Sequence, residues 1–252
     1  MLQQRLLQRA KNENSWLAAW WTDYAYMSYR DPVPINVNYF YAFADTPLSA
    51  SERAAAIVTG ALSFRELVNS ETLEPDTAKG KPEPDTAKGK PLCMRQYSHM
   101  FNSTRVPFVS SDITHSFPPM ENNFIVVVRK NTFYKLDLEL ATGQQLSTAQ
   151  LKVQFDKIYS LATKESPPVG ALTTENRDVW LAARNSLLSE SQINVASIDT
   201  IERAAFIVCL DDTSPVTKNE ISRACWHGDG RNRFFDKSMQ FVIFDNGKAG
   251  AL

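Results

Sequence analysis

Histidine and cysteine side chains are the groups of this sequence best suited to proton transfer or nucleophilic attack at neutral pH. His227 stands out because it adjoins Asp229 and two glycines, so that a carboxylate could orient its imidazole as a general base. A base also needs a substrate-facing geometry, and the simpler interpretation is a turn histidine that hydrogen-bonds its own loop. His99, on a short helix, and His115, in a loop before two prolines, are expected to be surface or structural residues.

The three cysteines, Cys93, Cys209 and Cys225, show no close paired spacing, so neither a zinc site nor a disulfide framework is indicated. Cys209 falls in the apolar run 205–210, where a small core residue is the simplest interpretation. No Ser-His-Asp spacing, Walker loop or Rossmann glycine pattern is present in the sequence. We therefore predict no catalytic residue and no metal ligand within this chain.

Aromatic side chains are concentrated in one predicted helix near the start of the chain. Ser15 can cap this helix, and Asp31-Pro32 ends it, because the residue before a proline is pushed out of the α region. Five aromatic residues within positions 16–26 of one helix are typical of a heavily buried element, and we expect core packing for most of them. They are Trp16, Trp20, Trp21, Tyr24 and Tyr26.

Three capping boxes and four apolar runs outline the elements that must position these side chains. Strands that alternate with amphipathic helices predict an α/β fold, a mixed β-sheet flanked by helices. The predicted helices begin after the boxes at Ser49–Glu52, Ser147–Gln150 and Thr217–Glu220, and a further helix ends at about Leu188. The predicted strands are 124–128, 133–138, 205–210 and 239–244; residues 33–38 are expected to be extended and residues 105–119 irregular.

The last strand, 239–244, is followed at once by Asn246-Gly247, which is typical of a type I′ hairpin turn. The sequence supplies only Lys248 to Leu252 for a return strand, so we expect an unfinished supersecondary unit. An unpaired strand could recruit a partner. We also expect an open apolar groove beside this strand.

The nonapeptide Glu74–Pro82 is repeated without change as Glu83–Pro91. The segment is polar and rich in proline, which is typical of a loop. We interpret the second copy as a tandem duplication tolerated in a poorly ordered surface loop, since extra loop length costs little closure entropy. A recognition loop is the functional alternative.

Composition excludes several classes of function. The formal net charge is −1, which argues against a nucleic-acid partner, and no apolar run approaches the ~20 residues that span a bilayer. The start of the chain, residues 1–10, is basic and amphipathic but lacks the apolar core of a secretory signal. It could be a weak organelle-targeting segment, and a reduced intracellular compartment is the default.

Four motifs occur at residues 14–33, 91–94, 172–180 and 232–247. Their sequences and their order resemble the choline/carnitine acyltransferase family, and most closely its carnitine acetyltransferase branch. The resemblance covers nearly the whole chain and implies the fold shared with chloramphenicol acetyltransferase, with residues 1–252 as a partial amino-terminal domain. The enzymes of this family transfer an acyl group between coenzyme A and carnitine, and a histidine serves as the general base.

The resemblance also implies where the site lies. Trp21 and Tyr26 match positions beside the carnitine end of the substrate tunnel, while the histidine would come a few residues beyond Leu252. Acetyl-coenzyme A is then a co-substrate bound mostly outside this chain, no cofactor is resident, and the protein is mitochondrial or peroxisomal. This chain alone is expected to be inactive and to need a complementary carboxy-terminal half. The alternative is a non-enzymatic half of a split enzyme, or an interaction module on a decayed acyltransferase scaffold.

Overall fold

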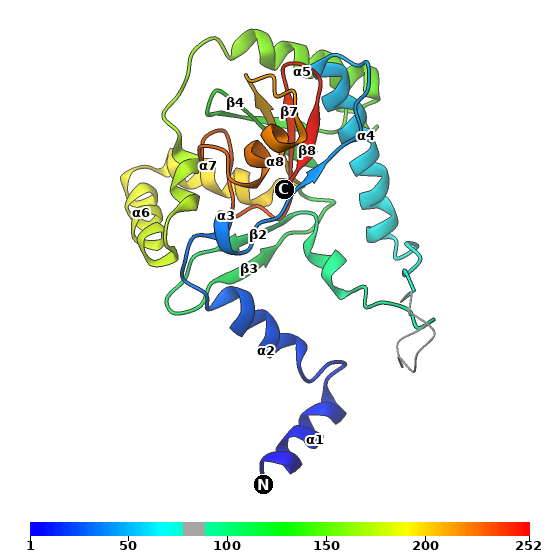
Figure 1. The fold of residues 1–252 in the computed structure, drawn as a ribbon, viewed down its shortest axis with the longest axis vertical. Coiled ribbons are helices and arrows are strands. Elements are labelled where there is room, and N and C mark those ends of the chain that lie inside the picture. The colour runs from blue at the N-terminus through cyan, green and yellow to red at the C-terminus, as the bar shows by residue number, and fades with distance from the viewer. Residues whose placement is uncertain (78–88) are drawn as a thin grey trace.

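A computed structural model describes residues 1–77 and 89–252 of the chain. Its body is a six-stranded mixed β-sheet flanked by helices, as predicted, with a two-stranded sheet beside it (Figure 1). The six strands lie in the order β1-β8-β7-β6-β4-β5. Their bounds are β1 Tyr41–Ala42, β4 Phe124–Arg129, β5 Thr132–Asp137, β6 Ile207–Asp211, β7 Gln240–Phe244 and β8 Ala249–Ala251.

Strands β4, β6 and β7 run parallel at the centre of the sheet, and β5 and β8 flank them in antiparallel pairs. The predicted apolar runs form these strands because a parallel centre is covered on both faces. Alternate side chains enter two separate cores. Val127 and Val208 face helices α4 (Ala50–Asn69) and α5 (Thr148–Leu161). Val128 and Cys209 face α6 (Arg177–Glu190), α7 (Gln192–Arg203) and α8 (Lys218–Trp226). Cys209 is the small buried residue that the sequence predicts.

All three predicted capping boxes are present, each with both reciprocal hydrogen bonds. They begin α4 Ala50–Asn69, α5 Thr148–Leu161 and α8 Lys218–Trp226. The remaining helices are α1 Leu2–Asn12, α2 Ala18–Thr22, the π-helix η1 Asp23–Met27, α3 Val33–Asn36, η2 Arg95–His99, η3 Val169–Thr174, α6 Arg177–Glu190 and α7 Gln192–Arg203. No helix among the described residues is long and apolar enough to cross a membrane.

Two local predictions were wrong, and one helix was missed. Residues 33–36 form helix α3 instead of an extended segment, because Pro34 falls in the first turn, where a missing N–H costs nothing. The stretch expected to be irregular contains the hairpin β2 Ser103–Val106 and β3 Ile113–Ser116. Helix α7 was not predicted at all.

The terminal hairpin also differs from its prediction. Its turn has three residues, with a left-handed Gly247 (φ 79°) at the last position, so Asn246-Gly247 is not a type I′ turn. Lys130-Asn131, with φ of 50° and 61°, is the two-residue turn of this kind, between β4 and β5. Strand β8 pairs with β7 on one side and with β1 on the other, so the expected unpaired strand is covered.

The ends of the duplicated segment meet. The backbone N–H of Leu92 donates to the carbonyl of Asp76 over 2.7 Å, and Thr77 bridges to Pro91. Residues 78–88, which hold most of both copies, lie outside the described residues, and so does the prediction that they are poorly ordered.

Candidate functional site

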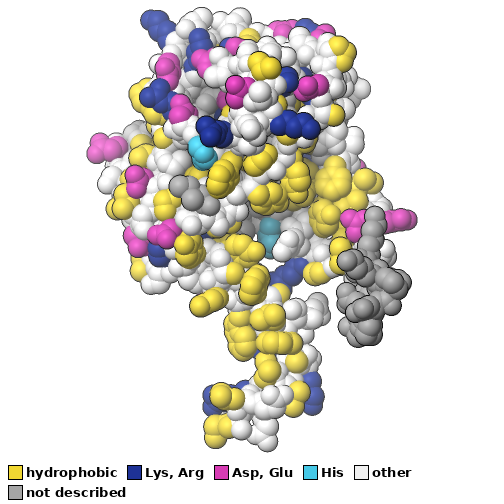
Figure 2. Space-filling view, in the orientation of Figure 1, with side chains coloured by type: hydrophobic (Ala, Val, Ile, Leu, Met, Phe, Trp, Pro, Cys, Tyr) yellow, Lys and Arg dark blue, Asp and Glu magenta, His cyan; other side chains and the backbone are white. Residues whose placement is uncertain are grey.

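The aromatic helix near the start of the chain is an exposed arm, and the prediction that it is heavily buried was wrong. Helices α1 and α2 project away from the body, and hydrophobic side chains gather on this projection (Figures 1 and 2). The exposed fractions of Trp21 and Tyr26 are 56% and 38%. Apolar periodicity marks a face that can be buried, but among the described residues of the arm only η1 and the turn after it hydrogen-bond to the body.

Trp21 and Tyr26 stand on either side of a change in helix type. Residues Asp23–Met27 form a π-helix, in which the N–H of Ser28 donates to the carbonyl of Asp23 over 2.8 Å. A spacing of five residues separates two side chains by roughly 140° around an α-helix. A π-turn closes over five residues, so it moves Tyr26 toward the face that carries Trp21. Single π-turns are frequent at functional sites.

A buried carboxylate, Asp112, ties the arm to the body. It accepts hydrogen bonds from three guanidinium groups, those of Arg30 (2.7 Å), Arg105 and Arg177 (2.6 Å). Its own backbone N–H donates to the carbonyl of Met27 over 2.9 Å. The turn that follows the π-helix is therefore held by residues far away in the sequence.

A second buried carboxylate, Asp236, continues this network. Arg177 bridges from Asp112 to Asp236 over 2.6 Å, and the indole N–H of Trp180 donates to Asp236 over 2.7 Å. The backbone N–H of Arg177 also donates to the carbonyl of Arg30 over 2.8 Å. Arg30, Arg177 and Asp236 come from three of the four family-like motifs, so the fold brings three distant motifs to one cluster.

The two carboxyl groups respond differently to their surroundings. Burial by itself raises the pKa of Asp112, but the charges of Arg177, Arg105 and Arg30 outweigh burial, and its pKa lies below the usual range. Burial raises the pKa of Asp236, and Arg177 and Trp180 offset only part of that rise. Asp112 therefore keeps its negative charge to a lower pH than an ordinary aspartate does. Sequence reasoning missed Asp112 and Arg105, and the charges within an otherwise irregular stretch were the only signal.

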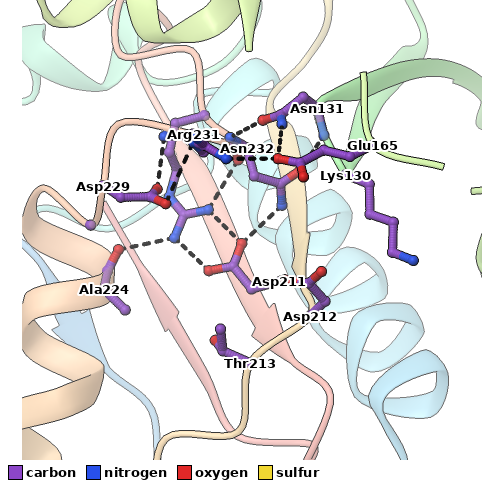
Figure 3. A pocket seen from close by; sticks show the side chains of 12 residues that line it. Lys130, Asn131, Glu165, Asp211, Asp212, Thr213, Ala224, Asp229, Arg231 and Asn232 are labelled. Atoms are coloured by element: carbon purple, nitrogen blue, oxygen red, sulfur yellow. Dashed lines mark hydrogen bonds and ion pairs between the residues drawn. The ribbon is translucent and has the colours of Figure 1, made fainter. Parts of the chain in front are cut away.

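The loop before β7 is held by a polar cluster that lines a cavity of about 340 Å³. Asn131 and Asn232 exchange hydrogen bonds, each donating its backbone N–H to the side-chain oxygen of the other (Figure 3). Arg233 forms a two-pronged ion pair with Asp211 over 2.6 and 2.8 Å. The side-chain N–H₂ of Asn232 also donates to Asp211. These polar groups are engaged with one another, so this part of the 232–247 motif has a structural role.

Among the described residues, the side chains of His99, Cys209 and His227 hydrogen-bond to Ser116, Gln240 and the Gly228 carbonyl. His227 donates its Nδ1–H to the carbonyl of the adjacent Gly228 over 2.7 Å, as the turn interpretation predicts. His99 lies on η2, while His115 lies on strand β3 and not in a loop. Burial raises the pKa of the Cys209 thiol to about 12, which keeps it protonated.

The expected apolar groove beside the last strand is present, with a volume of about 440 Å³. It runs between α4 and the start of β7, and Figure 2 shows hydrophobic side chains exposed beside α4. Phe43, Ile57, Phe64, Met239 and Phe241 are among its lining residues.

Comparisons with known proteins agree with the motifs. The family described as Choline/Carnitine o-acyltransferase matches residues 1–252. The chain is 34% identical over its whole length to the mitochondrial carnitine O-acetyltransferase of Saccharomyces cerevisiae, 38% of which it covers. It is 33% identical over 99% of its length to human carnitine O-acetyltransferase (41% covered), and 34% identical over its whole length to human choline O-acetyltransferase (35% covered). The chain therefore spans about two fifths of the length of these relatives.

Proposed function

Because this chain belongs to the choline/carnitine acyltransferase family, we propose that it forms the amino-terminal part of an enzyme that moves an acetyl group between coenzyme A and carnitine. The observation that carries this proposal is similarity along the whole chain to carnitine O-acetyltransferases. Choline is the alternative acceptor, because a choline O-acetyltransferase is equally similar.

The arm supports carnitine as the acceptor. Carnitine carries a carboxylate that choline lacks, and an indole N–H and a phenol O–H can both donate to a carboxylate. Trp21 and Tyr26 are both partly exposed, as residues that bind a ligand must be. We assign these two residues to substrate binding, at the carboxylate end of carnitine.

Acyl transfer to a hydroxyl needs a general base and a group that stabilises the oxyanion. His227 is engaged in its own turn, and we assign no base to His99 or His115. We therefore propose that the base, and most of the acetyl-coenzyme A site, are supplied from outside residues 1–252, and that this chain alone is inactive.

The same proposal gives the chain a partner, a complementary carboxy-terminal part of the acyltransferase. The exposed aromatic arm supports such a partner. The sequence suggested that an unpaired strand would recruit this partner, but β1 pairs with β8, so that strand gives the partner no support. By similarity to the mitochondrial yeast relative, we propose a mitochondrial location.

The test is reconstitution. The chain would be expressed alone and together with the carboxy-terminal part of the yeast carnitine O-acetyltransferase, and thiol release from acetyl-coenzyme A would be followed with carnitine or choline. We expect no turnover by the chain alone and carnitine-dependent turnover by the pair. Turnover by the chain alone would contradict the assignment of the base, and an inactive pair would contradict the proposed function.

A variant tests the binding residue. Trp21→Ala should raise the KM for carnitine about tenfold, the order of one lost hydrogen bond to a charged group, and leave the KM for acetyl-coenzyme A within twofold. Trp16→Ala, which removes another exposed indole of the same arm, is the matched control and should change neither KM more than twofold. Equal effects of the two substitutions would contradict a specific role for Trp21.

A further inference from the structure

The Asp112 cluster does more than join two parts of the chain, because it reaches the backbone of the substrate-facing segment directly. Nη2 of Arg105 donates to the carbonyl of Tyr26 over 2.9 Å and to that of Tyr29 over 3.3 Å. Nε of the same guanidinium donates to Asp112. One carboxylate therefore aims the group that clamps the end of the π-helix.

Two further bonds fix the same segment. The backbone N–H of Asp112 donates to the carbonyl of Met27, and the backbone N–H of Arg177 donates to that of Arg30. The carbonyls of Tyr26, Met27, Tyr29 and Arg30 are thus all held by this cluster. Outside it, Ser111 donates from its hydroxyl to the carboxylate of Asp23 at the start of the π-helix.

We propose that Asp112 is a positioning residue for the acyl acceptor, acting through Arg105 on the backbone of Tyr26. This role rests on the proposed function, which gives Tyr26 its contact with substrate. A buried ion cluster is a poor way to gain stability alone, because desolvation of the charges offsets much of their attraction. It is a good way to fix geometry, because a fork of N–H donors between a carboxylate and two carbonyls allows one arrangement.

Asp112→Asn separates positioning from general stability. The substitution removes the one negative charge shared by Arg30, Arg105 and Arg177, so their mutual repulsion should displace the Arg105 guanidinium. A positioning role predicts a selective effect on the acceptor. A merely structural role predicts either no kinetic effect in the folded variant or an equal loss for both substrates.

The experiment uses the full chain, co-expressed with the carboxy-terminal part of the yeast relative. We expect Asp112→Asn to raise the KM for carnitine about tenfold, with the KM for acetyl-coenzyme A within twofold. Amide hydrogen exchange of residues 23–30 should become at least tenfold faster, while exchange in the central strands β4 and β6 stays unchanged. Asp156→Asn, which breaks an exposed ion pair with Lys152 on α5, is the control and should alter none of these values.

A second variant covers the case in which Asp112→Asn does not fold. Arg105→Lys keeps a positive charge beside Asp112, but a single ammonium replaces the fork that reaches both Asp112 and the Tyr26 carbonyl. The same split between the two KM values is expected. A folded variant with an unchanged KM for carnitine, or an equal rise in both, overturns the role of Asp112 alone. An inactive wild-type pair overturns the proposed function and this role with it.

Discussion

The number of nonapeptide copies should change the free energy of unfolding only through the closure entropy of the loop. Thr77 and Pro91 are paired, and thirteen residues, 78–90, lie between them. Deleting Glu83–Pro91 regenerates the same junction, Pro-Leu, after one copy and leaves four residues in the closed segment. Adding a third copy would lengthen the segment to twenty-two residues. The paired ends are the same in all three chains.

The magnitude follows from loop closure, which costs about 0.6 kcal/mol for each doubling of length. Shortening from thirteen to four residues is between one and two doublings, so the one-copy chain should be more stable by about 1 kcal/mol at most. The three-copy chain should be less stable by roughly 0.5 kcal/mol. For a protein of this size a change of 1 kcal/mol corresponds to a shift in Tm of roughly 2–4 °C.

Urea unfolding of the one-, two- and three-copy chains would measure the free energies, with thermal unfolding as a second readout. A same-length control would replace residues 83–90 with a glycine- and serine-rich sequence and should leave stability within about 0.5 kcal/mol. If the one-copy chain lost several kcal/mol, the repeated residues would have to pack against the body, and the entropic reasoning would be refuted.

Two further predictions concern buried positions of the body. Burial lowers the pKa of Lys237 from 10.5 to about 7, so between these pH values the unfolded chain binds a proton that the folded chain lacks, and the free energy of unfolding should rise with pH. Lys237→Met should reduce this rise by up to about 1.4 kcal/mol per pH unit in urea titrations at pH 7.5–9.5; a slope equal to that of the exposed control Lys157→Met would contradict it. Gly250→Ala should cost about 1–3 kcal/mol, since its Cβ would lie 2.7 Å from the carbonyl of Tyr41. Gly60 lies in the middle of α4, and a Cβ added there would meet no atom within 4 Å. Gly60→Ala should therefore raise the free energy of unfolding by roughly 0.5–1 kcal/mol. Equal effects of the two substitutions would show that steric room at Gly250 is not limiting.

The sequence determined the elements whose hydrogen bonds are local or whose burial is two-sided. The capping boxes at Ser49, Ser147 and Thr217 satisfy the first N–H groups of their helices from residues three positions away, so short-range pattern is sufficient. The central strands are continuous apolar runs because both faces are covered. The family-like motifs are also sequence features, and the family match over residues 1–252 confirms the family that they predicted.

Tertiary structure decided what depends on residues far apart. A capped aromatic helix has the same pattern whether its face is covered or exposed, so the exposure of Trp21 and Tyr26 could not be read from spacing. The cover of β8 by β1 joins residues about two hundred positions apart. The Asp112 cluster is the clearest case, because Coulomb attraction acts across space and not along the chain. Only the fold places the carboxylate of Asp112 against Arg30, Arg105 and Arg177.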